Sequence, residues 1–341
     1  MTPLDLLVRE QIRAHGPMPY AEFVEIALYH DEHGFYSTGG RAGRRGDFIT
    51  SPEVGPLFGL LVARALDAEW DRLDQPEVFT VIDFGAGPGT LARSINAGQP
   101  RCRDALQYVA IERSIAQRAQ HPEWVLSLPE VSESVIGDGV VGVIIANELL
   151  DNLPFTPFSR REDGLYRHDI AIGEQDALEV VSDDVLDAED VALFDGDIER
   201  GVLQRSASAW LQRRLEDLAT GCVWVIDYAR LSSAEVEVRT YAEHGRGGDP
   251  LDEIGTKDVT TDVDLSQLER AVRPADRIIL QAEWLTSLGI HELVEEGKRI
   301  WEAGAASGSL EALRGRSRVR EAEALLSSEG LGAFYFAEWR H

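Results

Sequence analysis

The stretch VIDFGAGPGTLARSI, residues 81–95, passes from an apolar run through three alternate glycines into a segment with helical spacing. Small residues where a strand enters a helix let the backbone approach a ligand closely, with the helix N–H groups facing that ligand. We therefore expect Gly85, Gly87 and Gly89 to bind a cofactor, with Asp83 immediately before the turn.

The spacing of these glycines favours S-adenosylmethionine over a dinucleotide. The dinucleotide pattern G-x-G-x-x-G would require glycine at position 90, where the chain has threonine. The pattern D-x-G-x-G-x-G, beginning at Asp83, is typical of S-adenosylmethionine turns. A nicotinamide-binding turn and a purely structural turn are the alternatives.

An acidic residue after the next apolar run supports the same cofactor. Glu112 stands at the carboxyl end of the second predicted strand, where open α/β sheets bind ligands. A carboxylate there can accept hydrogen bonds from both ribose hydroxyls, and it disfavours a phosphorylated ribose, which calls for arginine. Leu128, at the end of the third predicted strand, completes this group of cofactor contacts.

Short apolar runs separated by helical segments predict an α/β fold with a doubly wound, Rossmann-like sheet. The runs lack strict alternation, which is typical of parallel strands covered on both faces. They lie at 78–84, 105–112, 123–128, 140–146 and 222–228, with crossover helices near 90–97 and 113–120.

The end of the chain predicts a mixed sheet of seven strands. Seven-stranded methyltransferases close with a reversed last strand beside the fifth, whereas dinucleotide folds end in a parallel sixth strand. The segments RIILQAEW (277–284) and FYFAEW (334–339), separated by a helical region, lie where that closure is expected.

We divide the chain into a methyltransferase core and added segments, with N-terminal helices at 3–15 and 19–30 and a glycine-rich irregular stretch at 31–55. The predicted parts are an N-terminal helical region with a cofactor-covering loop (1–75), the first half of the core (76–151), a substrate-covering insertion (152–219), and the second half of the core (220–341), which carries an insertion at 229–275.

The composition restricts the class of partner. The net charge of −27 repels phosphate backbones and anionic lipid, so nucleic acid and membrane surfaces are not expected as partners. No segment is apolar enough to insert in a membrane, the first residues do not form a signal peptide, and a cytoplasmic location is expected. Cys102 and Cys222 show no metal-binding spacing, so we expect both to be buried and no metal to be bound.

The segment NELLDNLPF (147–155) follows the fourth predicted strand and carries the candidate catalytic residues Asn147, Glu148 and Asp151. A helical turn would place the two carboxylates on one face. Paired acids at this edge suit a cationic acceptor such as arginine, because they offset its repulsion from a sulfonium and hold a guanidinium by two hydrogen bonds. The structural alternative is that Asn147 caps the turn and the acids face water.

The chain resembles the MidA-type protein arginine methyltransferases, whose mitochondrial members assist assembly of respiratory complex I. The resemblance covers nearly the whole chain, and its departures are Leu149 and Leu150 at positions that are usually aromatic and Asp262 at a position that is usually small or histidine. The matching stretches, in the order of the family, are LYHDEHGFY (28–36), GDFITSPE (46–53), DFGAGPGTL (83–91), ANELLDNLPF (146–155), VIDY (225–228), DVTTDVDLSQL (258–268) and WLTSLGI (284–290).

This resemblance implies that Asn147 and Glu148 line the methyl-transfer site and that the acceptor is an exposed arginine on a protein, dimethylated symmetrically on a respiratory-chain subunit. It also implies that four residues fold over the cofactor, namely Asp47, Phe48, Thr50 and Ser51.

Other functions stay open at this stage. A small-molecule O- or N-methyltransferase on the same core, a cofactor-binding assembly protein without catalysis and, more distantly, a nicotinamide oxidoreductase are the alternatives. The oligomeric state is undetermined, with a dimer as one option. Roles for His244, Asp227 and Tyr228 at the acceptor are equally open, because each also has a structural explanation.

Overall fold

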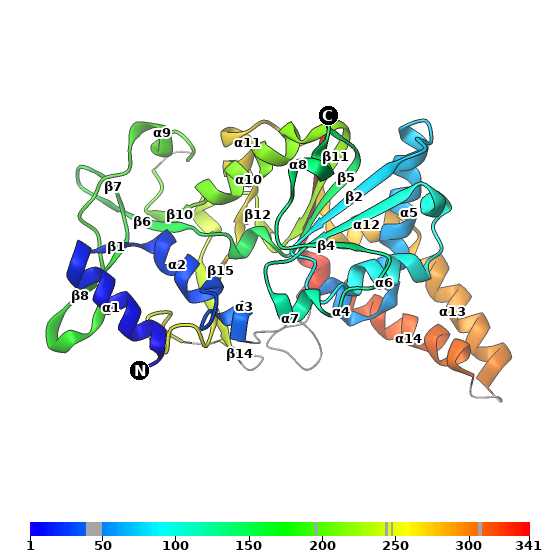
Figure 1. The fold of residues 1–341 in the computed structure, drawn as a ribbon, viewed down its shortest axis with the longest axis horizontal. Coiled ribbons are helices and arrows are strands. Elements are labelled where there is room, and N and C mark those ends of the chain that lie inside the picture. The colour runs from blue at the N-terminus through cyan, green and yellow to red at the C-terminus, as the bar shows by residue number, and fades with distance from the viewer. Residues whose placement is uncertain (39–49, 195–196, 243–244, 247, 306–308) are drawn as a thin grey trace.

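The computed structural model describes residues 1–38, 50–194, 197–242, 245–246, 248–305 and 309–341. Its centre is a seven-stranded sheet in which the strands lie in the order β17-β18-β11-β5-β2-β3-β4 (Figure 1). The strands are β2 (Phe79–Phe84), β3 (Leu106–Ile111), β4 (Leu126–Leu128), β5 (Val140–Asn147), β11 (Leu218–Asp227), β17 (Arg277–Leu280) and β18 (Tyr335–Arg340).

The seven-stranded mixed sheet is confirmed, including its reversed last strand. β18 lies between β11 and β17 and is antiparallel to both, whereas β11, β5, β2, β3 and β4 are parallel neighbours. Three strand boundaries differ from the prediction by more than one residue: β4 begins only at Leu126, β11 begins at Leu218 rather than at position 222, and β17 ends at Leu280. The apolar residues after Leu280 belong to a helix. A short apolar run in a sequence does not distinguish a helix from a strand.

Helices cover both faces of this sheet and make a three-layer core. Alternate strand residues point to opposite faces, so Val81 and Ile145 pack on one side while Ile82 and Ile144 pack on the other. The first face is covered by α5 (Pro56–Arg72), α6 (Thr90–Ala97), α12 (Gln281–Ser287), α13 (Ile290–Gly304) and α14 (Leu310–Leu325), and the second by α10 (Arg205–Glu216) and α11 (Leu265–Ala271).

The N-terminal helices form as predicted. α1 (Pro3–His15) begins with a capping box in which Thr2 and Asp5 exchange hydrogen bonds, and α2 (Tyr20–Tyr29) follows it. The stretch 31–55 was expected to be irregular, but it contains α3 (Phe35–Thr38) near its start and α4 (Ser51–Val54) near its end.

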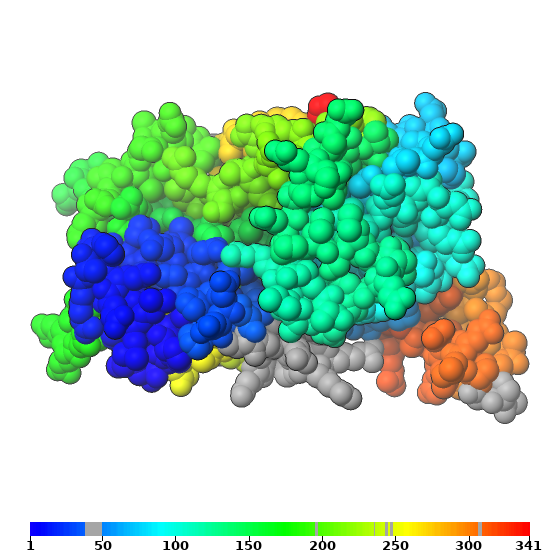
Figure 2. All heavy atoms as spheres, viewed as in Figure 1, coloured from blue at the N-terminus to red at the C-terminus, as the bar shows by residue number. Residues whose placement is uncertain are grey.

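Smaller sheets lie beside the central one and pack against the N-terminal helices. Met18 pairs with Ile170, and the first residues of the chain lie against this region on the left of Figure 2. The remaining elements are β1 (Met18–Pro19), β6 (Thr156–Arg161), β7 (Gly164–Arg167), β8 (Asp169–Ile172), β9 (Leu178–Val181), β10 (Arg200–Leu203), β12 (Ala229–Arg230), β13 (Val238–Ala242), β14 (Gly245–Arg246), β15 (Asp258–Thr261), β16 (Val263–Asp264), α7 (Ile115–Arg118), α8 (Glu133–Ile136) and α9 (Ala188–Val191).

The predicted division of the chain at residues 75, 151 and 219 stays a prediction. Within the described residues, no helix combines the length and the apolar character needed to cross a membrane.

Candidate active site

The glycine turn after β2 has the backbone conformation that requires glycine. Gly85, Gly87 and Gly89 have φ values of 68°, 55° and 80°, in the left-handed region that is strained for residues with a side chain. A Cβ on Gly85 would lie 3.0 Å from Leu149 Cδ1. Because α6 begins at Thr90, its first N–H groups face the turn, which suits a ligand that approaches the backbone closely.

His121 supports the glycine turn, and the sequence analysis missed it. Its Nε2 lies 2.8 Å from the carbonyl oxygen of Gly87, and its Nδ1 lies 2.8 Å from Ser127 Oγ. A carbonyl oxygen only accepts, so Nε2 carries the proton and Nδ1 accepts from the serine hydroxyl. Burial lowers the pKa of His121, which favours this neutral form. Nothing in the spacing marks a histidine 34 residues beyond the turn.

The two acids predicted to serve the cofactor lie on either side of the turn. Asp83 is buried and accepts a hydrogen bond from Tyr108 Oη at 2.8 Å, and burial raises the pKa of its carboxyl to about 7. The Glu112 carboxylate accepts from Gly87 N at 3.0 Å and from Ser114 N at 2.8 Å. Burial raises the pKa of Glu112 as well. Glu112 therefore reaches the glycine turn, whereas Asp83 faces the sheet interior.

Leu128 lies beside Glu112 at the same edge of the sheet. The backbone N–H of Glu112 donates to the carbonyl of Leu128 at 3.0 Å, which continues the parallel pairing of β3 with β4. The two residues thus end neighbouring strands next to the glycine turn.

The turn after β5 carries the predicted catalytic residues in a conformation that the sequence did not indicate. Glu148 has a φ of 54°, which is uncommon for a residue with a side chain and is often found at functional sites. A 3-10 turn begins only at Leu150, so the helical-turn argument for pairing the two acids is wrong. Asn147 does not cap this turn; its Nδ2 donates to Glu148 Oε1 at 3.1 Å.

The segment before α5 contacts the same carboxylate. The backbone N–H of Ser51 donates to Glu148 Oε1 at 2.8 Å, and Ser51 Oγ donates to Gln281 Oε1 at 3.1 Å. Thr50 is buried beside Ser51 at the start of α4. Asp47 and Phe48, which were also predicted to cover the cofactor, lie outside the described residues.

Three carboxylates at this edge are grouped without a basic partner. Among the described residues, no arginine, lysine or histidine forms an ion pair with Glu148, Asp151 or Asp227. Burial raises the pKa of Glu148 to about 8 and that of Asp151 to about 6, and the negative charge of Asp151 adds to the rise at Glu148. Burial, followed by the charges of Asp151 and Glu148, raises the pKa of Asp227. The site is therefore prepared to receive positive charge.

Several acceptor atoms at this edge have open lone pairs. Asn147 Oδ1 and Asp151 Oδ1 are buried and accept no hydrogen bond from a described residue. Asp151 Oδ2 accepts from Thr260 Oγ1 at 2.8 Å, and Glu148 Oε1 accepts from Ser51 N and Asn147 Nδ2. Buried polar atoms are normally paired, so unpaired acceptors indicate a ligand with N–H donors.

Two tyrosines from the N-terminal region form hydrogen bonds to the 3-10 turn at Leu150–Asn152. The sequence analysis did not select them. Tyr29 and Tyr36 stack with ring centroids 5.6 Å apart. Their hydroxyls donate to Asn152, at the carbonyl oxygen (3.1 Å) and at Oδ1 (3.0 Å) respectively. Asn152 Nδ2 in turn donates to Asp258 Oδ1 at 2.9 Å. The motif LYHDEHGFY contains both tyrosines, and it was the one available signal.

The other residues with open roles occupy different places. Asp227 is buried at the end of β11 next to the Glu148 turn. The ring of Tyr228 lies beneath the Arg239 guanidinium, 4.9 Å from its centroid, and that guanidinium forms an ion pair with Asp262. His244 lies outside the described residues.

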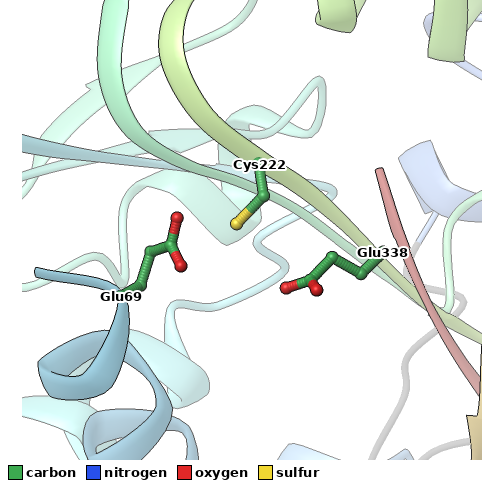
Figure 3. Close-up of side chains that lie close together, drawn as sticks. All are labelled: Glu69, Cys222 and Glu338. Carbon is green, nitrogen blue, oxygen red and sulfur yellow. The ribbon is translucent and has the colours of Figure 1, made fainter. Parts of the chain in front are cut away.

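A second cluster, near the middle of β11, contains side-chain types that can ligate metals. Figure 3 shows Glu69 from α5, Cys222 from β11 and Glu338 from β18 converging, and their ligand atoms lie within 4.8 Å of one another. Arg340 donates to Glu69 at 2.9 Å and to Glu338 at 2.8 Å, and Arg72 donates to Glu69 at 2.6 Å. These guanidinium groups supply the positive charge that a metal would bring, so the cluster fits a structural ion-pair network.

Comparison with known proteins agrees with this geometry. The family described as "Putative S-adenosyl-L-methionine-dependent methyltransferase" matches residues 61–283. That match covers more than half of the chain and includes the glycine turn and the Glu148 turn. The chain belongs to this family, and S-adenosylmethionine is its cofactor.

Curated relatives and solved structures are more distant. The chain is 26% identical over 312 residues to the mitochondrial protein arginine methyltransferase NDUFAF7 homolog of Drosophila melanogaster, covering 75% of this chain and 67% of that protein. It is 26% identical over 304 residues to NDUFAF7 of Rattus norvegicus, covering 79% and 70%. A COG1565 superfamily protein from Burkholderia thailandensis, solved with S-adenosyl-homocysteine, has the same fold, with a TM-score of 0.83 at 24% identity over 99% of this chain and 92% of that one.

Proposed function

We propose that this methyltransferase methylates an arginine side chain on a protein, and that Glu148 and Asp151 hold the guanidinium. The observation that carries the proposal is the group of three acids, Glu148, Asp151 and Asp227, which have no basic partner among the described residues. A carboxylate that is removed from water without a positively charged partner costs free energy, so a cationic ligand is the simplest account of their presence.

The residues around the glycine turn fit the cofactor. The left-handed turn admits a ligand close to Gly85, Gly87 and Gly89, and Glu112 has lone pairs left for ribose hydroxyls after its two backbone contacts. We expect Ser51 and its neighbours to border the methionine end, because Ser51 contacts Glu148. When bound, S-adenosylmethionine supplies an electrophilic methyl group on a positively charged sulfur.

The acids would offset the repulsion between two positive groups. At a separation of 4 Å, two unit charges repel by about 1 kcal/mol in water and about 4 kcal/mol at an effective dielectric constant of 20. Asp151 Oδ1 accepts from no described residue and is available to one N–H group of the guanidinium, and the Glu148 carboxylate has lone pairs left for a second. Such a paired contact also fixes the direction in which the acceptor nitrogen points.

The same carboxylates provide a destination for a proton. A guanidinium nitrogen that gains a methyl group must release one proton to return to a single positive charge. Glu148, whose pKa is about 8, is matched to accept a proton near neutral pH. Thr260 and Ser51 hold Asp151 and Glu148 in place while this happens.

The identity of the acceptor is the most specific part of the proposal. The relatives in fly and rat carry the name protein arginine methyltransferase, which supports arginine as the acceptor. The resemblance to the MidA-type enzymes supports symmetric dimethylation of a respiratory-chain subunit. We adopt both as part of the proposed function.

A labelled-methyl assay tests this function. Purified protein and S-adenosylmethionine with an isotopically labelled methyl group are incubated with lysate from source cells that lack the gene, and modified peptides are mapped by mass spectrometry. We expect label on an arginine side chain, and none with the Glu148→Gln variant. Label on a small molecule, or on another side chain, would contradict the proposal.

A further inference from the structure

Asp227 accepts hydrogen bonds from the backbone of the turn after β5 at residues 148–150, which we call the Glu148 turn, as well as from its own strand end. Its side chain is fully buried at the end of β11. Oδ2 accepts from the backbone N–H groups of Leu149 at 3.2 Å and Leu150 at 2.9 Å, and Oδ1 accepts from the N–H of Tyr228 at 2.8 Å. One carboxylate thus receives three backbone donors from two strands' ends.

These contacts fix a backbone that would otherwise be unfavourable. Glu148 has left-handed dihedral angles, and its own N–H donates to the carbonyl of Ile226 at 2.8 Å. The residue before Asp227 and Asp227 itself therefore hold three consecutive N–H groups of the turn, those of residues 148, 149 and 150. The next residue in the turn, Leu149, packs over Gly85, so the same turn also borders the glycine turn.

We propose that Asp227 is a positioning residue for methyl transfer, acting through the backbone of residues 148–150 to aim the Glu148 carboxylate at the acceptor. The inference rests on the role proposed above for Glu148. Asparagine cannot replace this aspartate, because both carboxylate oxygens accept N–H groups and an amide would turn one NH₂ donor toward another donor.

Asp227 also interacts electrostatically with the other acids of the site. The groups that face this cluster include Asp151 from the 3-10 turn, Ser51 from α4 and Asp262, whose charge is balanced by Arg230 and Arg239. The charges of Asp151 and Glu148 raise the pKa of Asp227, whereas the rise in the pKa of Glu148 comes from burial and the charge of Asp151. We therefore expect Asp227 to act on Glu148 through backbone geometry and not through the pKa of Glu148.

The test combines one variant with a matched control at a residue just before the same strand. Asp217 precedes β11, is buried like Asp227, and forms ion pairs with Arg213 and Arg214. We expect Asp227→Asn to lower kcat about a hundredfold, with the affinity for S-adenosylhomocysteine and the acceptor KM changed only a few-fold. We expect Asp217→Asn to lower the unfolding temperature without changing kcat or the pH profile.

A double-mutant cycle with Glu148→Gln separates positioning from a general loss of structure. If Asp227 acts through Glu148, adding Asp227→Asn to Glu148→Gln lowers kcat little further. Multiplicative effects or wild-type kcat in Asp227→Asn overturn this inference alone. Wild-type kcat in Glu148→Gln overturns both it and the proposed function. If Asp227→Asn does not fold, Asp227→Glu keeps the carboxylate but displaces both oxygens. A reduced kcat that falls little further when Glu148→Gln is added supports the inference, and wild-type kcat overturns it.

Discussion

Acidic side chains lie at both ends of β11, but among the described residues only those toward its amino end are paired with arginine. Asp217, just before the strand, is paired with two arginines, and Glu69 and Glu338, beside Cys222, share Arg340. At the carboxyl end, the Asp227 carboxylate accepts from backbone N–H groups and from no described arginine, lysine or histidine, and Glu148 lies next to it. The sheet therefore has one edge with balanced charges, which stabilises the fold, and one edge with unbalanced charges, which we assign to ligand binding.

The largest expected effect is on turnover at the unbalanced edge. Glu148→Gln keeps the shape of the side chain but removes the charge that offsets two approaching cations, so single-turnover methyl transfer should fall about a hundredfold or more while cofactor affinity stays within a few-fold. Asp151→Asn should act in the same direction and more weakly, since one of its oxygens is already held by Thr260.

Glu69→Gln at the balanced edge is the control, and its transfer rate should equal that of the parent. Equal rates for the parent and Glu148→Gln would remove the proposed distinction between the two edges.

The balanced edge should respond through stability instead. Arg340→Gln removes the guanidinium that Glu69 and Glu338 share, leaving Glu338 with Trp224 as its neutral donor. Because Arg340 is partly exposed and Glu69 keeps Arg72 as a partner, we expect a cost of about 1–2 kcal/mol of unfolding free energy. Urea denaturation followed by fluorescence measures this change. A folded variant with unchanged stability, or one with a reduced kcat, would show that the edges are not separate in function.

The unbalanced edge should make stability depend on pH in the opposite sense to an ordinary ion pair. The pKa of Glu148 is about 8 in the folded protein against an ordinary value of 4.5, so the folded state holds the proton more tightly. Stability without ligand then falls as pH rises from about 4.5 to about 8. Glu148→Gln should lack this loss and be more stable than the parent at pH 8 by on the order of 1 kcal/mol.

The comparison for this prediction is thermal unfolding of both proteins at pH 5 and pH 8 without cofactor. Parent and Glu148→Gln should unfold at similar temperatures at pH 5 and diverge at pH 8. A parent protein that is the more stable of the two at pH 8 would indicate that Glu148 has a cationic partner within the chain.

The smallest expected effect concerns metal at the balanced edge. Because arginines occupy the space around Glu69 and Glu338, dialysis against EDTA and addition of zinc should leave the unfolding temperature unchanged, and Cys222→Ala should not alter methyl transfer. A zinc-dependent rise in unfolding temperature that Cys222→Ala abolishes would revise the charge balance assigned to this end.

Local patterns predicted much of the cofactor side of the site. The glycine turn and the strands around it are consecutive in the chain, so their geometry follows from residues 78–97 and from the strand ending before Glu112. The reversed last strand was also predictable, because its position near the chain end is a property of the fold class. The end of β17 at Leu280 was not, since the following residues are as apolar in a helix as in a strand.

The acceptor side depended on contacts between distant segments. Tyr36 reaches Asn152 across 116 residues, and Ser51 reaches Gln281 across 230, so no local pattern indicates either pair. Asn147, Glu148 and Asp151 lie close together at the sheet edge, but not for the reason that the sequence suggested. The sequence predicted a helical turn. In the structure, the acids are brought together because Glu148 has a left-handed backbone conformation and its N–H donates to β11.

Binding of a cationic acceptor tests the assignment of the unbalanced edge most directly. The probe is a pair of peptides around the mapped acceptor, one with arginine and one with citrulline, which has nearly the same shape without the charge. Calorimetry on protein saturated with S-adenosylhomocysteine should show the arginine peptide binding about tenfold or more tightly. This preference should disappear in Glu148→Gln and persist in Glu69→Gln. Equal affinity of the parent protein for the two peptides would contradict the account.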